Sequence, residues 1–299
     1  MNFFLFSLVL FLSTLSAADM TLLPYFGTTI NDRSKAKSLK AATGYFGLYT
    51  SYKDKQNQFD FTYNYAKTIY KSGNPLSDFN QKDFTIKYTR EVDKTFSLIG
   101  LHTIHNTESS VYTDLGSGYI GFIGFKELYQ YEDYKLSYGA DVYYSLYTQA
   151  HAETSRSSTI SIAIAQFSPY GIYSSDLSQG IRNDFTLRVN AISAAQYTQK
   201  NYLSIEVINT TYFHNTYLTL HYLGGKIRSG ITNEGFTVYN NKDIYNGIYN
   251  LTLGYFKRSE LSFDLSYALS TFKEFNPDTL VLLPNGKSST ILGSMRYQF

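Results

Sequence analysis

A two-residue alternation of apolar and polar side chains recurs along most of this chain, and it limits the possible folds more than any other feature. In residues 261–270 (LSFDLSYALS), Leu, Phe, Leu, Tyr and Leu alternate with Ser, Asp, Ser, Ala and Ser. Successive side chains of a strand point to opposite faces, so such a segment has one apolar and one polar surface. The same alternation recurs in residues 59–66, 84–89, 134–146, 185–191, 203–207, 218–222 and 249–255. A helical period of about 3.6 is almost nowhere present, so the pattern predicts an all-β protein.

The length of the alternating segments separates a soluble β-sandwich from a membrane β-barrel. Sandwich strands usually have about 5 or 6 residues, whereas membrane-spanning strands need roughly 9 to 11. Residues 59–69, 134–147 and 261–272 reach the longer value. The connections also alternate between short ones, such as 93–94, 214–215 and 258–259, and long polar ones, such as 71–82, 148–158, 228–243 and 273–287. This asymmetry is typical of antiparallel transmembrane barrels.

Working back from the last residue through each short and long connection predicts about 14 strands, with 12 and 16 left open. Pro24 restricts the first of them, four glycines interrupt the one at 114–126, and Pro169 requires a strand end or a bulge. The expected strands are 21–30, 43–53, 58–70, 83–92, 96–105, 114–126, 134–147, 159–172, 182–192, 201–213, 217–227, 244–257, 260–272 and 289–299.

The first residues predict export from the cytoplasm. Residues 3–15 (FFLFSLVLFLSTL) form an apolar run, and Ser16, Ala17 and Ala18 supply the small residues of a cleavage site. The run is shorter than the roughly 17 to 25 residues of a spanning helix, although the two residues before it lack the usual Lys or Arg. We therefore expect a cleaved signal peptide at 1–18 and one barrel domain at 19–299, in the outer membrane.

Composition excludes several classes of function. The chain has no Cys, which rules out disulfide scaffolds, thiol catalysis and Cys-based metal sites. Its formal net charge of +2 argues against nucleic-acid binding by bulk charge. No residue spacing implies a metal or a cofactor. The 30 Tyr and 22 Phe are expected mainly in aromatic girdles at the two membrane interfaces.

The C-terminal residues carry a recognisable signature. Residues 291–299 (ILGSMRYQF) end on Phe299, with Tyr297, Met295 and Gly293 at alternate positions before it. This resembles the assembly signal of Gram-negative outer-membrane β-barrel proteins, including porin-like ones. The resemblance implies that Tyr297 and Phe299 are read by the barrel-assembly machinery, and that lipid and lipopolysaccharide surround the barrel.

The polar face of the strands would line the lumen. It carries acids and bases in equal number, which predicts no strong preference for ions of one sign. The leading interpretation is a passive diffusion channel for small hydrophilic solutes, narrowed by the inward candidates Tyr143 and Tyr147. The expected channel-facing residues are Asp60, Lys87, Lys135, Asp141, Arg188, Glu206, His221, Asp264 and Arg296.

Two binding or transport alternatives remain. Small barrels can be filled by their own side chains, which would leave a surface or adhesive protein. The segment 31–42 would then act through Arg33, Lys35, Lys37 and Lys40 on lipopolysaccharide phosphates. Fourteen strands also resemble fatty-acid channels for hydrophobic compounds, but those carry a sizeable N-terminal plug, whereas here only residues 19 and 20 precede the first strand.

A hydrolase is the least favoured reading. His102 and His105 are three residues apart, so on a strand they point to opposite faces. His151 is expected in a loop near Glu153 and Ser155, and His214 in a two-residue turn. Neither a G-x-S-x-G elbow nor an H-E-x-x-H motif occurs, and we expect no catalytic residue.

Overall fold

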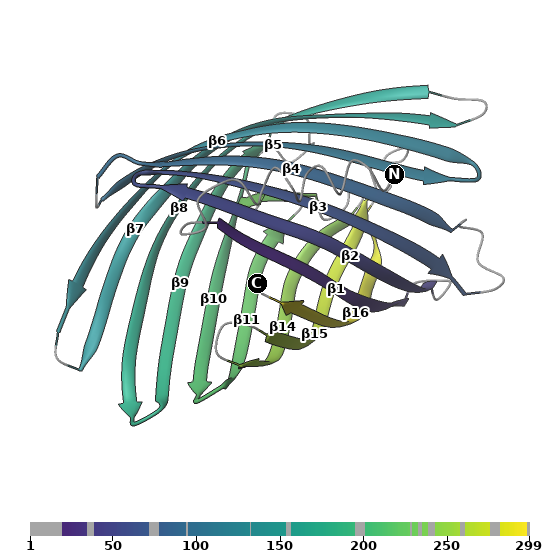
Figure 1. Cartoon of the computed structure of the whole chain (residues 1–299). Coiled ribbons are helices and arrows are strands. Elements are labelled where there is room, and N and C mark those ends of the chain that lie inside the picture. Colours follow the sequence, from purple (N-terminus) through teal and green to yellow (C-terminus); the bar gives the residue numbers. More distant parts are fainter. Residues whose placement is uncertain are drawn as a thin grey trace.

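A computed structural model describes residues 20–34, 39–71, 78–93, 95–131, 133–153, 157–194, 201–227, 229–232, 235–238, 243–257, 261–275 and 282–297. In these residues the chain is all-β, and fourteen strands form one closed antiparallel barrel (Figure 1). Two further strands, β12 and β13, pair only with each other. The described residues contain no helix that is long and apolar enough to cross a membrane. The predicted signal peptide and Phe299 lie outside them.

The barrel strands follow one another in chain order, except that β14 is the neighbour of β11. The strands are β1 (Met20–Ser34), β2 (Leu39–Asp54), β3 (Asn57–Tyr70), β4 (Phe79–Glu91), β5 (Phe96–Ser109), β6 (Tyr112–Gln130), β7 (Tyr134–Glu153), β8 (Ser157–Ser178), β9 (Ile181–Ala194), β10 (Asn201–Phe213), β11 (Thr216–Ile227), β12 (Ser229–Thr232), β13 (Gly235–Val238), β14 (Asp243–Lys257), β15 (Leu261–Phe275) and β16 (Leu282–Tyr297).

The first and last strands close the barrel. Their register runs from Tyr25 opposite Arg296 to Ser34 opposite Lys287. Closure leaves the barrel no free sheet edge, so each of its fourteen strands has hydrogen-bonding neighbours on both sides. The predicted count of fourteen strands is therefore confirmed, and each of the fourteen expected segments overlaps one strand of the barrel.

Several predicted strand ends were wrong. The segment 148–158 is not a long loop, because β7 continues to Glu153 and β8 begins at Ser157. Its polar composition suggested a loop, but an antiparallel ladder can continue with polar side chains where neither face must be apolar. Pro169 lies inside β8 instead of at its end. The β8–β9 ladder is interrupted there, because Phe167 pairs with Ala191 and the next pair is Tyr170 with Arg188, in the same register. This interruption accommodates the missing N–H of the proline.

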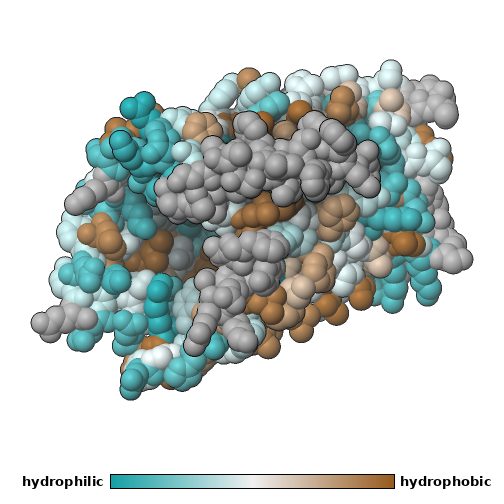
Figure 2. All heavy atoms as spheres, viewed as in Figure 1, coloured by the Kyte–Doolittle hydropathy of each residue, from teal (hydrophilic) through white to brown (hydrophobic). Residues whose placement is uncertain are grey.

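The two faces of each strand differ as the alternation predicted. Large apolar side chains on one face are exposed on the outside of the barrel, for example Leu220, Leu251, Tyr267 and Ile291 in one row across four strands. Figure 2 shows hydrophilic side chains gathered at the two ends of the barrel, with hydrophobic ones between them. The other face is the inside, because only on the concave side can side chains of strands two apart meet. Arg188 of β9 does so with Asp141 of β7, across β8.

Candidate solute pathway through the barrel

A chain of ionisable side chains crosses the inner wall from β7 to β11. Arg188 Nη1 lies 3.7 Å from Asp141 Oδ2, and Arg188 Nε lies 3.8 Å from Glu206 Oε2. Glu206 Oε1 is in turn 2.9 Å from His221 Nε2. The Tyr143 hydroxyl donates to Asp141 at 3.0 Å, and the Arg188 guanidinium lies 5.1 Å from the centre of the Tyr170 ring. Each charge is thereby matched by an opposite charge or a polar hydrogen.

A second charged group lies on β15, β16 and β11. Arg296 Nη2 lies 3.6 Å from Asp264 Oδ2, and Ser294 donates to the same oxygen at 3.3 Å. The Tyr217 hydroxyl donates to Asp264 from β11, across β14. Arg296 keeps 58% of its side chain exposed, against 11% for Asp264. The acid is therefore enclosed by donors, while the guanidinium remains accessible from the barrel interior.

Asp60 and Lys87 form the third group, on β3 and β4. They are direct partners in the ladder. Asp60 is 6% exposed, and its Oδ1 accepts hydrogen bonds from Tyr49 at 2.8 Å and from Gln58 at 2.9 Å. A buried carboxylate needs such donors, because an unpaired one would be costly.

A cavity of about 630 Å³ joins the second and third groups on the inner wall. Arg296 and Ser294 border it on one side, and Asp60 and Lys87 on the other. Tyr25, Tyr45 and Tyr49 of β1 and β2 lie between them. We refer to the three groups together as the charged belt. It consists of Asp60, Lys87, Asp141, Arg188, Glu206, His221, Asp264 and Arg296.

These eight residues are all among the nine expected to face the channel, and the register places all nine on the inner face. The ninth, Lys135, stands apart from the belt. It lies opposite Gln130 where β7 leaves its short turn. Contact of any of the nine with a solute stays a prediction, as does recognition of Tyr297, which ends β16.

Inner tyrosines pack over glycines of the neighbouring strand. Tyr25 is opposite Gly47 and Tyr45 is opposite Gly27, and a Cβ on either glycine would come within 2.3 Å of the tyrosine side chain. Tyr147 covers Gly116 and Gly118 in the same way. Its ring fills the space that side chains at these two positions of the glycine-rich strand β6 would occupy. An aromatic ring that occupies the space above a glycine lies along the wall. The expected aromatic girdle therefore accounts only for the outward tyrosines.

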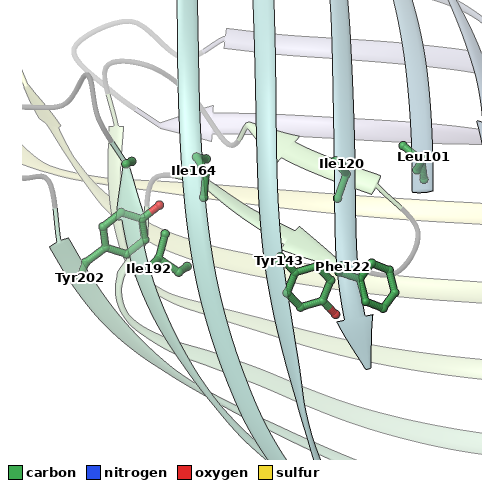
Figure 3. Packing of buried hydrophobic residues seen from close by; sticks show 8 residues of the cluster. Leu101, Ile120, Phe122, Tyr143, Ile164, Ile192 and Tyr202 are labelled. Atoms are coloured by element: carbon green, nitrogen blue, oxygen red, sulfur yellow. The ribbon is translucent and has the colours of Figure 1, made fainter. Parts of the chain in front are cut away.

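Part of the inner wall is apolar. Leu101, Ile120, Phe122, Tyr143, Ile164, Ile192, Ala194 and Tyr202 form one buried cluster, with exposures between 0% and 8%. They come from β5 to β10 and share the inward parity of the charged belt (Figure 3). Apart from Tyr143, which was expected to point inward, this cluster was not predicted, because its members occupy positions of the otherwise polar face.

The β12–β13 hairpin, which lies between β11 and β14 in the chain, contacts barrel strands that are not neighbours of β11 or β14. Its strand β12 contacts β8, and its strand β13 contacts β6. In the barrel, β8 is separated from β11 by β9 and β10, and β6 is farther still. A hairpin in the chain between β11 and the adjacent β14 can meet those strands only by reaching across the barrel, through its interior or over its opening. A hairpin in this position would narrow the passage, although the residues of β12 and β13 were predicted as a plain loop.

Two Asp–His pairs lie on the inner face nearer the long connections. His105 Nδ1 is 2.5 Å from Asp83 Oδ1, and His105 Nε2 is 2.8 Å from Thr107 Oγ1. His151 Nδ1 is 2.5 Å from Asp114 Oδ1. His151 is part of strand β7, so the prediction that it lies in a loop was wrong. Pairing across strands brings these residues together, and the linear spacing of the histidines held no signal for it.

The order carboxylate, imidazole, hydroxyl in Asp83, His105 and Thr107 is that of a nucleophilic triad. Thr107, however, is 6% exposed and pairs with β4 and β6 on both sides. Its neighbouring backbone N–H groups are thus engaged in the ladder and unavailable to an oxyanion. His102 points outward and stacks on Tyr119, with ring centres 4.2 Å apart, so the two histidines do face opposite sides.

The described residues contain no group of three or more His, Asp or Glu side chains placed to hold a metal ion. Of the four bases expected to meet lipopolysaccharide, Arg33 and Lys40 lie on β1 and β2, and Lys40 Nζ is 3.1 Å from Asp32. Lys35 and Lys37 lie outside the described residues.

No protein-family profile and no curated protein sequence matches the chain. Solved structures do resemble it. The Pseudomonas putida toluene transporter TodX is 10% identical, with a TM-score of 0.50 over 95% of this chain and 90% of TodX. A BenF-like porin from Pseudomonas fluorescens Pf-5 is 10% identical, with a TM-score of 0.46 over 94% and 99%. A Pseudomonas aeruginosa FadL homologue is 9% identical, with a TM-score of 0.46 over 94% and 90%. The barrel fold is thus shared with TodX.

Proposed function

We propose that this chain is an outer-membrane channel that passes small hydrophilic solutes by passive diffusion, and that it is not an enzyme. The closed barrel satisfies its backbone hydrogen bonds internally, which a lipid environment demands. Its outer surface carries rows of exposed Leu, Ile, Phe and Tyr side chains, far more apolar surface than a soluble monomer leaves in water. Lipid and lipopolysaccharide are the surroundings we expect for such a surface, with assembly through the C-terminal signal.

The observation that carries the proposal is the charged belt on the inner wall. Ionisable side chains on that wall need water or partners, and the belt supplies both signs in close succession around the barrel. Such a lining lowers the cost of moving a hydrated solute past it and favours neither cations nor anions strongly. The inner tyrosines that pack over glycines lie along the wall and leave space in the lumen, which rings pointing toward the barrel axis would fill.

The test is single-channel conductance of the refolded barrel in planar lipid bilayers, with reversal potentials measured across a salt gradient. We expect discrete steps and weak ion selectivity. Glu206→Gln removes a negative charge from the belt and should move the reversal potential toward anion preference. Arg188→Gln should move it toward cation preference.

The matched control is Glu108→Gln, which removes the same charge from an exposed residue on the outer face of β5. Its reversal potential should equal that of the unmodified protein. Heat-modifiable gel mobility and circular dichroism establish that each variant is folded. A folded barrel that produces no conductance steps would overturn the proposal, and so would equal shifts in the belt variants and the control.

A second candidate, passage of small apolar compounds, is favoured by the apolar cluster on the inner wall. Ile164 and Ala194 are fully buried there, and Tyr202 adjoins them. Binding of a naphthalene-type fluorescent probe by the barrel in amphipol, and its loss in Ile164→Glu with Leu203→Glu on the outer face as control, would support this candidate. Retention of probe binding in Ile164→Glu would eliminate it.

A further inference from the structure

We infer that the cavity between β16 and β5 is a solute-binding site for sugar acids, meaning hydroxyl-rich rings of one or two units that carry a carboxylate. This inference deepens the proposed channel function and rests on it. The cavity has a volume of about 630 Å³, within the range of small-molecule sites. Its lining combines three chemistries that such a solute requires.

The first is a set of flat aromatic surfaces. Tyr25 and Tyr45 contact each other, with ring centres 6.4 Å apart, and each covers a glycine of the opposite strand. The glycines hold the rings along the wall, where a pyranose ring can pack its C–H face on them. Tyr49 extends the surface toward Asp60.

The second is a ring of hydroxyl and amide groups. Gln58, Thr62, Thr85 and Ser294 line the cavity together with the tyrosine hydroxyls. A sugar presents several hydroxyls that both donate and accept hydrogen bonds, and these groups can do the same. Gln58 and Ser294 already donate to Asp60 and Asp264, so they offer a solute their acceptor oxygens, for which a purely aromatic acid has few donors.

The third is positive charge at both borders. Arg296 approaches from β16 and leaves 58% of its side chain exposed, while Lys87 approaches from β4. The acids nearby are already engaged, since Asp60 accepts from Tyr49 and Gln58, and Asp264 accepts from Tyr217, Ser294 and Arg296. A guanidinium that still faces the interior can pair with a carboxylate.

The experiment measures binding in two independent ways, with glucuronate, glucose and benzoate as probes. Interruptions of the single-channel current report binding during passage, and isothermal titration of the barrel in detergent reports binding without conductance. We expect glucuronate to bind at least about tenfold more tightly than glucose or benzoate. One charge-assisted hydrogen bond, or a few neutral ones, contributes about this factor to an affinity. Arg296→Gln and Lys87→Gln should each remove most of the preference over glucose.

Lys67→Gln is the matched control, because Lys67 is an exposed cation on the outer face of β3. It should bind glucuronate like the unmodified protein. Equal affinity for glucuronate and glucose would overturn the role of the two cations, and equal affinity for benzoate would overturn the sugar assignment. Conductance without glucuronate binding refutes this inference and leaves the channel intact. Binding by titration without conductance supports the site and refutes the channel.

Discussion

Replacing Leu251 by Arg tests whether the outer face of the barrel lies in lipid. Leu251 is near the middle of β14, is 44% exposed, and lies in the row formed with Leu220, Tyr267 and Ile291. Arg at the middle of the lipid-facing side of a barrel costs about 2–4 kcal/mol. Because about 1.4 kcal/mol corresponds to a factor of ten, the folding equilibrium constant should fall roughly 30- to 700-fold.

The neighbouring substitution Thr252→Arg is the matched control, because position 252 faces the interior. Thr252 Oγ1 lies 2.8 Å from Ser266 Oγ, so its loss removes one hydrogen bond, worth about 0.5–1.5 kcal/mol. The new guanidinium can then reach interior water and the belt acid Asp264, which lies two residues from Ser266 on the same face. The cost should therefore be clearly smaller than for Leu251→Arg.

The assay is urea titration of each barrel folded into phosphatidylcholine vesicles, read by gel mobility without heating and by circular dichroism. The difference between the two variants should persist in vesicles and shrink in detergent micelles, where Arg at position 251 can reach water. Equal stability of the two variants in vesicles would refute the assignment of inner and outer faces.

Three shorter predictions address the interior. Gly254→Ala places a Cβ within 2.2 Å of the Tyr217 ring and should destabilise the barrel in urea by about 1–3 kcal/mol, whereas Gly121→Ala, with no neighbour within 4 Å, should change little. Replacement of residues 229–238 by a short Gly-Ser linker should increase single-channel conductance, and unchanged conductance would contradict a hairpin that narrows the passage. His105→Ala leaves Asp83 without its imidazole partner and should lower the urea midpoint, whereas His102→Ala, on the outer face, should lower it less.

The period-two alternation determined a large part of this protein without any tertiary information. Because side-chain direction on a strand depends only on the parity of a residue within it, the sequence sufficed to assign Asp60, Asp141 and Asp264 to the same face as Arg188 and Arg296. The number of strands also followed, since each alternating segment long enough to span a membrane becomes one strand. Strand ends did not follow, because ladders such as β7–β8 continue with polar side chains beyond the apolar segment.

Only the tertiary structure decided which of these residues meet. Arg296 and Asp264 are brought together by the register between β15 and β16, and Asp83 and His105 by the register between β4 and β5. Register depends on turn lengths and on how the whole barrel closes, which no local period records. The same holds for the β12–β13 hairpin and for the apolar inner cluster. Their positions result from contacts between strands far apart in the sequence. Alternation therefore predicts which side chains face the interior, but it does not predict which of them come into contact there.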